Sequence, residues 1–173
     1  SSAASDVYKR QDEEDGRMNL GVVSVNVPRI AIESHGSKER FWKLFNERME
    51  VAHQALQFRI MRCKQATPVN APTLFRFGAF GRLGASGNVD TLFKNERATV
   101  SLGYIGLAEA TAVFYGKDWI RDHGWDPQGK EFALSIVKRM SELCKQWSKA
   151  EGYHYSVYST PVSYTHLTLP TIA

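Results

Sequence analysis

Residues 20–27, Leu-Gly-Val-Val-Ser-Val-Asn-Val, carry the pattern from which the fold can be worked out. From Val23 to Val27 every second residue is a valine, and the polar Ser24 and Asn26 stand between them. Because successive side chains of an extended chain point to opposite faces, this alternation predicts a β-strand with one apolar face and one wet or functional face. The proline that follows is expected to end the strand.

The pattern becomes helical from Lys38 to about Lys64, with Ser37 as the expected N-cap. Apolar residues recur there at spacings of three and four, which places them along one stripe of a helix. The stripe consists of Phe41, Phe45, Met49, Ala52, Leu56, Ile60 and Cys63. This helix is therefore expected to pack against another layer.

A second set of elements is expected after a proline-containing loop over 64–72. Residues 73–83 are apolar and fit either a strand or a helix, and 84–88 fit a turn. Residues 98–102 are typical of a buried strand, which 103–107, with two glycines, are expected to turn into a short helix ending near Tyr115.

The third strand is expected at residues 153–159, directly after a long helix. Asp126 followed by Pro127 is an N-cap with proline at the first helical position, and the helix should run to about Ala150. Its inner face carries Phe132, Ile136, Met140, Leu143 and Trp147. Strand, helix, strand, helix, strand predicts an α/β fold with a parallel sheet and its crossovers on one face.

Composition places the chain among ordinary globular proteins, with 43% hydrophobic and 23% charged residues in 173. No run approaches the roughly 18 apolar residues of a membrane span, and no signal peptide is recognisable, so we expect a cytoplasmic protein with no membrane partner. The net charge of +4 is spread along the helices, which favours a solvated surface over nucleic-acid binding. Cys63 and Cys144 have no neighbours at metal-ligand spacing, so we expect no metal site and two buried thiols.

Candidate site residues gather where strands are expected to end, since ligands of parallel sheets bind near the carboxyl ends of strands. A serine and a threonine, Ser159 and Thr160, could hold a phosphate at a helix start, although from the residues alone a plain N-cap is the favoured explanation. Asn19, Ser24 and Asn26 are further candidates at the first strand, with a structural hydrogen-bonding role as the alternative. Neither His53 nor His154 has a partner at triad spacing, so we assign them no catalysis.

One stretch resembles a known family closely. Gly16 to Ala31, GRMNLGVVSVNVPRIA, matches the G-R-x-N-x-G-V-V-T-x-N-L-P-R-I-A-L pattern of the oxygen-sensitive class III, glycyl-radical ribonucleoside-triphosphate reductases. Further matches follow in the same order, at Phe41–Leu44 with Glu47-Arg48, at Asn70–Pro72 with Phe77–Ala79, at Val100–Leu107 and at Tyr155–Pro161. The resemblance covers residues 12–161.

This resemblance implies part of a ten-stranded α/β barrel and specific roles for three residues. Asn19 matches the family's substrate-facing asparagine, which is linked with formate, and an amide can donate and accept at once. Thr160-Pro161 match the start of the family's phosphate-binding loop, but the A-E-[SG] that normally follows is replaced by 162–164, Val-Ser-Tyr. Ser159 and Thr160 are therefore expected to form only the beginning of that phosphate-binding loop.

The resemblance also implies what the parent, the full-length enzyme to which this segment would belong, requires. It should convert ribonucleoside triphosphates to 2′-deoxyribonucleoside triphosphates for DNA synthesis, with formate as reductant, a glycyl radical, ATP or dNTP effectors and a C-terminal zinc site. It should act as a homodimer with a radical-SAM activase. The thiyl cysteine, the radical glycine and the zinc ligands are expected outside this chain, which alone should be inactive.

The two ends, residues 1–11 and 162–173, lack the periodicity of the middle and resemble translated cloning adaptors, so 12–161 is expected to be the barrel segment. Two other functions remain open. A pyruvate formate-lyase-like acyltransferase shares the barrel, but it requires an adjacent cysteine pair and leaves the G-R-x-N match unexplained. A noncatalytic nucleotide-binding α/β module would account for the strands and for the phosphate site.

Overall fold

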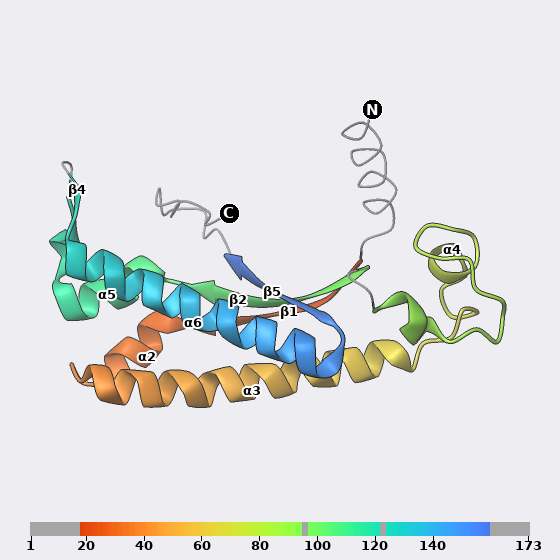
Figure 1. Ribbon diagram of the computed structural model, residues 1–173, viewed down its shortest axis with the longest axis horizontal. Coiled ribbons are helices and arrows are strands. Elements are labelled where there is room, and N and C mark those ends of the chain that lie inside the picture. The colour runs from red at the N-terminus through yellow and green to blue at the C-terminus, as the bar shows by residue number, and fades with distance from the viewer. Residues whose placement is uncertain (1–17, 95–96, 122–123, 160–173) are drawn as a thin grey trace. The chain divides into compact units, whose positions relative to one another are not determined.

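The computed structural model describes residues 18–94, 97–121 and 124–159 (Figure 1). In chain order the elements are β1 (Met18–Asn26), α2 (Val27–Glu33), α3 (Lys38–Lys64), α4 (Pro72–Phe75), η1 (Val89–Leu92), β2 (Ala98–Ile105), α5 (Leu107–Tyr115), η2 (Lys117–Trp119), β3 (Ile120–Arg121), β4 (Gly124–Trp125), α6 (Pro127–Glu151) and β5 (His154–Ser159). The predicted adaptor-like ends lie outside the described residues.

The main sheet has the strand order β1-β2-β5, with β2 in the middle. The N–H of Met18 donates to the carbonyl of Arg97, and further along the same strands Ser24 lies against Gly103. Residue numbers rise together along the two strands, so β1 and β2 run parallel, and β5 points the same way in Figure 1. The predicted α/β fold with a parallel sheet is confirmed.

The two long helices begin where the sequence predicts. Ser37 caps α3 by accepting the N–H of Arg40 at 3.2 Å, and Asp126 caps α6 by accepting the N–H of Gly129 at 2.8 Å. The predicted stripe of α3 is buried from Phe41 to Ile60, whereas its last member, Cys63, is only half-buried. On α6 the prediction holds except at Leu143, which is half-buried beside the buried Cys144.

Several local predictions were wrong. Val27 does not end the strand but begins α2, whose N-cap Asn26 accepts the N–H of Arg29 at 3.1 Å. Residues 73–83 form neither a strand nor a long helix, because only α4 forms before the chain bends. β2 continues to Ile105, so the turn into α5 is confined to Gly106. The antiparallel β3-β4 hairpin was not predicted.

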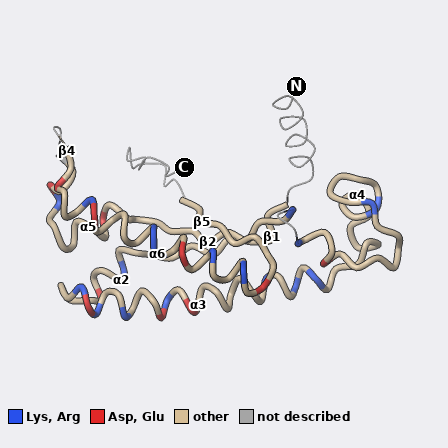
Figure 2. Tube along the Cα trace, viewed as in Figure 1, with Lys and Arg blue, Asp and Glu red and all other residues tan. Residues whose placement is uncertain are grey.

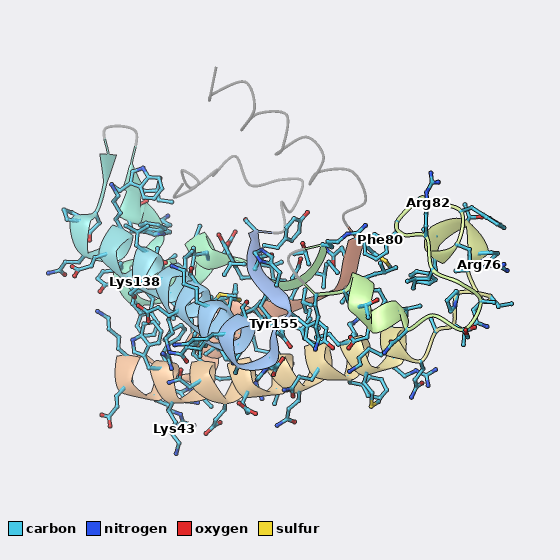
Figure 3. The ribbon with its side chains drawn as sticks, turned by 45° about the vertical axis from the view of Figure 1, so that its right-hand side comes forward. Lys43, Arg76, Phe80, Arg82, Lys138 and Tyr155 are labelled. Carbon is cyan, nitrogen blue, oxygen red and sulfur yellow. The ribbon has the colours of Figure 1, made fainter. Side chains whose placement is uncertain are left out.

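The chain divides into two compact units, each built from three segments. The first comprises the described residues of Ser1–Val22, Ala55–Ser101 and Cys144–Ser156. A buried ring cluster there joins Phe75, Phe80 and Phe93, with Phe80 and Phe93 stacked at 6.2 Å between ring centroids (Figure 3). This cluster anchors the irregular segment between α3 and β2.

The second unit comprises Val23–Gln54, Leu102–Leu143 and the described residues of Val157–Ala173. Its core is an aromatic cluster in which the ring of Phe132 of α6 lies 5.2 Å from Phe41 of α3 and 5.1 Å from Phe114 of α5. The Phe114 pair is edge-to-face, a geometry that contributes about 0.5–1.5 kcal/mol beyond the burial of its area, and the Phe41 pair is tilted. The cluster therefore holds three helices together.

Charged residues of both signs are interspersed along α3, as Figure 2 shows. Its Arg48 approaches Glu33 of α2, which also pairs with Arg29 one turn earlier. Arg29 and Arg48 are exposed and Glu33 is partly exposed, and ion pairs in contact with solvent contribute little to stability. The arrangement fits the predicted solvated surface.

Candidate functional site

Asn19 lies near the start of β1, and both ends of its side-chain amide are hydrogen-bonded. Its Oδ1 accepts the backbone N–H of Gly21 at 2.9 Å, and its Nδ2 donates to Oγ of Ser101 on β2 at 3.1 Å. A backbone N–H can only donate, so the amide oxygen has to face Gly21 and the amide nitrogen has to face Ser101. The two contacts therefore define the orientation of the amide.

This orientation leaves hydrogen-bonding capacity for a ligand. Nδ2 has a second N–H and Oδ1 has a second lone pair. Ser101 is 3% exposed, whereas Asn19 is exposed. The amide is thus held from its buried side and can both donate to and accept from a small polar ligand, such as a carboxylate or a hydroxyl, without adding charge.

The neighbouring Gly21 is closely covered by α3. A Cβ at this position would lie only 2.5 Å from Cδ of Arg59. Next to it, the carbonyl of Leu20 accepts a weak hydrogen bond from the Cys63 thiol at 3.8 Å. The backbone on which Asn19 stands is therefore packed against α3 within the first unit, which restricts its movement.

The other polar candidates of the first strand have structural partners. Asn26 uses its side chain to cap α2. Ser24 packs so closely on the neighbouring strand that a Cβ on Gly103 would lie 2.5 Å from its Oγ. Asn19 is therefore the one of the three whose geometry suits a ligand best.

The two predicted phosphate-binding residues are only partly described. Ser159 is the last residue of β5 and is exposed, whereas Thr160 lies outside the described residues. Asn19 belongs to the first unit and Ser159 to the second, so the two are described separately. The phosphate-binding role of these residues stays a prediction.

The carboxyl ends of β1 and β2 lead into α2 and α5, which meet at Gly106. This residue has φ of +70°, and a Cβ on it would lie 2.3 Å from Cγ of Pro28. Only glycine fits both the left-handed backbone and this close approach. The junction fixes where the two helices begin.

The sequence patterns did not predict a polar cluster around Asp90. The hydroxyl of Tyr153 donates to Oδ1 of Asp90 at 2.6 Å, and Nζ of Lys64 lies 3.5 Å from Oδ2. Burial raises the pKa of Tyr153, and the nearby tyrosine hydroxyl and carboxylate raise the pKa of Lys64. No periodic pattern reveals residues this far apart, and the cluster ties η1 to the end of α3 and to the residue that precedes β5.

Tyr155, on β5, is more deeply buried than Tyr153. Tyr155 donates to Glu151 of α6, and its ring lies 5.6 Å from that of Trp147 (Figure 3). Burial, reinforced by the neighbouring carboxylate, raises the pKa of Tyr155. A phenol held protonated in this way stabilises the junction of α6 and β5 and is not suited to act as a base.

The two cysteines differ in their surroundings. Cys144 is buried, and burial raises the pKa of its thiol to about 12, the reverse of what a reactive thiol requires. Within 18–94, 97–121 and 124–159 no group of three or more His, Cys, Asp or Glu residues could hold a metal ion. None of the helices in these ranges is long and apolar enough to cross a membrane.

Sequence comparisons link the chain to one family. Residues 2–166 match the family model described as anaerobic ribonucleoside-triphosphate reductase. The curated relatives of that name include those of Haemophilus influenzae, 46% identical over 154 residues, and Escherichia coli, 43% identical over 148 residues. These alignments cover 88% and 85% of the chain but only 21% and 20% of the relatives, so the chain spans about a fifth of their length.

Solved structures give the same fold. The anaerobic ribonucleotide reductase of Thermotoga maritima with citrate in the active site superposes with a TM-score of 0.64 at 17% identity, over 86% of this chain and 25% of that one. The same enzyme in complex with dATP and CTP gives a TM-score of 0.60 at 19% identity, over 82% of this chain and 22% of that one. The predicted α/β architecture is thus that of part of the reductase.

Proposed function

The chain belongs to the anaerobic ribonucleoside-triphosphate reductase family, and from this we propose that it is a segment of the catalytic domain of such an enzyme. The intact protein converts ribonucleoside triphosphates to 2′-deoxyribonucleoside triphosphates by radical chemistry, with formate as reductant, and so supplies DNA synthesis in the cytoplasm. The family assignment favours this reading over the pyruvate formate-lyase-like alternative, and the identity of 46% with a named reductase supports it.

The proposed function can be assigned to one residue, Asn19, because both ends of its side-chain amide are hydrogen-bonded to the protein. Its Oδ1 and Nδ2 are occupied on the protein side by Gly21 and Ser101, and one N–H and one lone pair remain. We assign the remaining N–H of Nδ2 and the remaining lone pair of Oδ1 to hydrogen bonds with substrate or formate. A neutral amide can orient formate or a ribose hydroxyl without the electrostatic cost of a second charge.

Ser159 and Thr160 are assigned to the beginning of the phosphate-binding loop. The exposed position of Ser159 at the carboxyl end of β5 supports this, since a phosphate has to be reached from solvent. Mutating Ser159 should therefore raise the KM for the nucleotide and leave the KM for formate unchanged.

The cofactors of the parent are assigned to the parts of the enzyme that this chain does not span. The described residues offer no cluster that fits zinc, and the raised pKa of the Cys144 thiol does not suit a nucleophilic cysteine. The glycyl radical, the zinc site, the ATP or dNTP effectors, the homodimer and the radical-SAM activase belong to the proposed whole enzyme.

The test is the substitution Asn19→Ala in the full-length reductase that contains this segment. We expect formate-dependent turnover to be abolished while the glycyl-radical signal keeps its wild-type intensity. Asn26→Ala is the matched control, because it removes the same side chain from the same strand but only uncaps α2, at a stability cost of about 1 kcal/mol. Wild-type kinetics for Asn19→Ala would remove Asn19 from the active site.

A second test uses the 173-residue chain itself. It should form no deoxyribonucleotide from ribonucleoside triphosphate and formate under anaerobic conditions, even with the activase. Product formation by the purified chain would contradict the assignment of the radical residues to other parts of the enzyme.

A further inference from the structure

We propose that Ser101 is a positioning residue that sets the orientation of the Asn19 amide for its ligand. The inference rests on the proposed function, because it assumes that Asn19 contacts substrate or formate. Ser101 lies 82 positions from Asn19 in the sequence, and the two side chains meet because β1 and β2 are neighbours in the sheet.

The hydrogen bond to Ser101 fixes the geometry of the Asn19 amide. A single hydrogen bond from Gly21 to Oδ1 holds one end of the amide but leaves it free to swing about that contact. The second bond, from Nδ2 to Ser101 Oγ at 3.1 Å, fixes the other end. Together they determine the plane of the amide and the direction of its remaining N–H.

Ser101 is itself held rigidly by its surroundings. It is buried at 3% exposure, and the adjacent Val100 and Leu102 are completely buried. A side chain on a central strand with such neighbours has few alternative rotamers. Asn19, in contrast, is exposed and would sample several rotamers if it lacked this partner.

A serine at this buried position of β2 has a cost that a functional role explains. A buried hydroxyl has to be hydrogen-bonded, and an apolar residue would avoid that requirement in a buried strand. Here the hydroxyl accepts from a side chain that faces solvent on its other side. This links a buried scaffold residue to an exposed functional group, as a preorganised site requires.

The experiment compares four variants of the full-length reductase that contains this segment. Ser101→Ala removes the acceptor, and Ser101→Thr keeps it. Ser135→Ala is the matched control, since the Ser135 hydroxyl donates only within α6, to the carbonyl of Phe132 at 2.6 Å. Asn19→Ala tests whether Asn19 contacts substrate or formate at all. Turnover, the KM values for formate and nucleotide, the glycyl-radical signal and the melting temperature are measured for each.

We expect Ser101→Ala to lower kcat/KM about tenfold, the effect of one lost hydrogen bond, with the radical signal and melting temperature close to those of Ser135→Ala. Ser101→Thr should recover most of the activity. In a crystal structure of Ser101→Ala, the Asn19 side chain should occupy more than one rotamer. Should Ser101→Ala fail to fold, Ser101→Cys, which retains the volume with a weak acceptor, provides the same comparison.

The outcomes separate the two proposals. If Asn19→Ala retains wild-type turnover, the role of Asn19 is wrong, and the role of Ser101 with it. If Asn19→Ala is inactive but Ser101→Ala is as active as Ser135→Ala, only the inference about Ser101 is overturned. A fall in activity that Ser101→Thr does not recover, accompanied by a fall in melting temperature, would show a structural role and would also overturn it.

Discussion

The substitution Gly106→Ala tests whether the junction of β2, α5 and α2 depends on the absence of a side chain. Gly106 combines φ of +70° with a close approach to the ring of Pro28. The added Cβ would lie 2.3 Å from Cγ and 2.7 Å from Cδ of that ring. Pro28 cannot move aside easily, because it stands in the first turn of α2, which is anchored by the buried Val27 and Ile30.

The expected magnitude has two parts. The left-handed conformation costs a residue with a Cβ about 1–2 kcal/mol. Overpacking against a fixed ring adds about 1–3 kcal/mol. We therefore expect Gly106→Ala to lower the free energy of unfolding by about 2–5 kcal/mol.

Gly36→Ala is the matched control, since Gly36 has φ of +81° but no atom within 4 Å of the position that a Cβ would take. Only the backbone part applies to it, so we expect a loss of about 1–2 kcal/mol.

The assay is equilibrium urea unfolding of the 173-residue chain, followed by tryptophan fluorescence. At an m-value of about 2 kcal/mol/M, a loss of about 3 kcal/mol lowers the midpoint by about 1.5 M, and Gly36→Ala should lower it by about 0.5–1 M. Equal midpoints for Gly106→Ala and Gly36→Ala would refute the reasoning, because they would show that Pro28 yields without cost.

Asp126→Ala should lower the free energy of unfolding by about 1 kcal/mol, since it removes the 2.8 Å acceptor of the Gly129 N–H, and an unchanged urea midpoint would contradict the cap. In the native chain Cys63, which is half-buried, should react with a thiol reagent before Cys144, which mass spectrometry of the labelled peptides can check. Burial raises the folded-state pKa of Cys144 from 9.0 to about 12, so its contribution to stability is complete below pH 9 and is lost as the pH rises from 9 towards 12. Between pH 9 and 10 the urea midpoint should therefore fall less steeply for Cys144→Ala than for the wild type, since the tyrosines titrate in both proteins and cancel from the comparison; equal slopes would argue against the raised pKa of Cys144.

Local chemistry made the long helices predictable. Ser37 and Asp126 are N-caps whose side chains bond the first turn wherever the helix is placed. The apolar stripe of α3 likewise depends only on the helical period, and its buried residues agree with the prediction up to Ile60.

Shorter elements escaped prediction because their stability comes from contacts distant in sequence. α2 has seven residues, too few to form alone, and it exists because Val27, Ile30 and Ala31 are buried in the second unit. The irregular segment after α3 is likewise held by Phe75 and Phe80 against Phe93. An apolar stretch of eleven residues does not reveal which of its members will find such partners.

The sequence by itself determined the α/β class, the two long helices, the family and the choice of Asn19 as a candidate, because caps, periodicity and ordered motifs are properties of neighbouring residues. Only the tertiary structure decided which polar side chains of β1 are already used, with Asn26 capping α2 and Ser24 packed against Gly103. It also placed Ser101 beside Asn19, because hydrogen bonds between adjacent parallel strands join residues that a whole crossover separates along the chain.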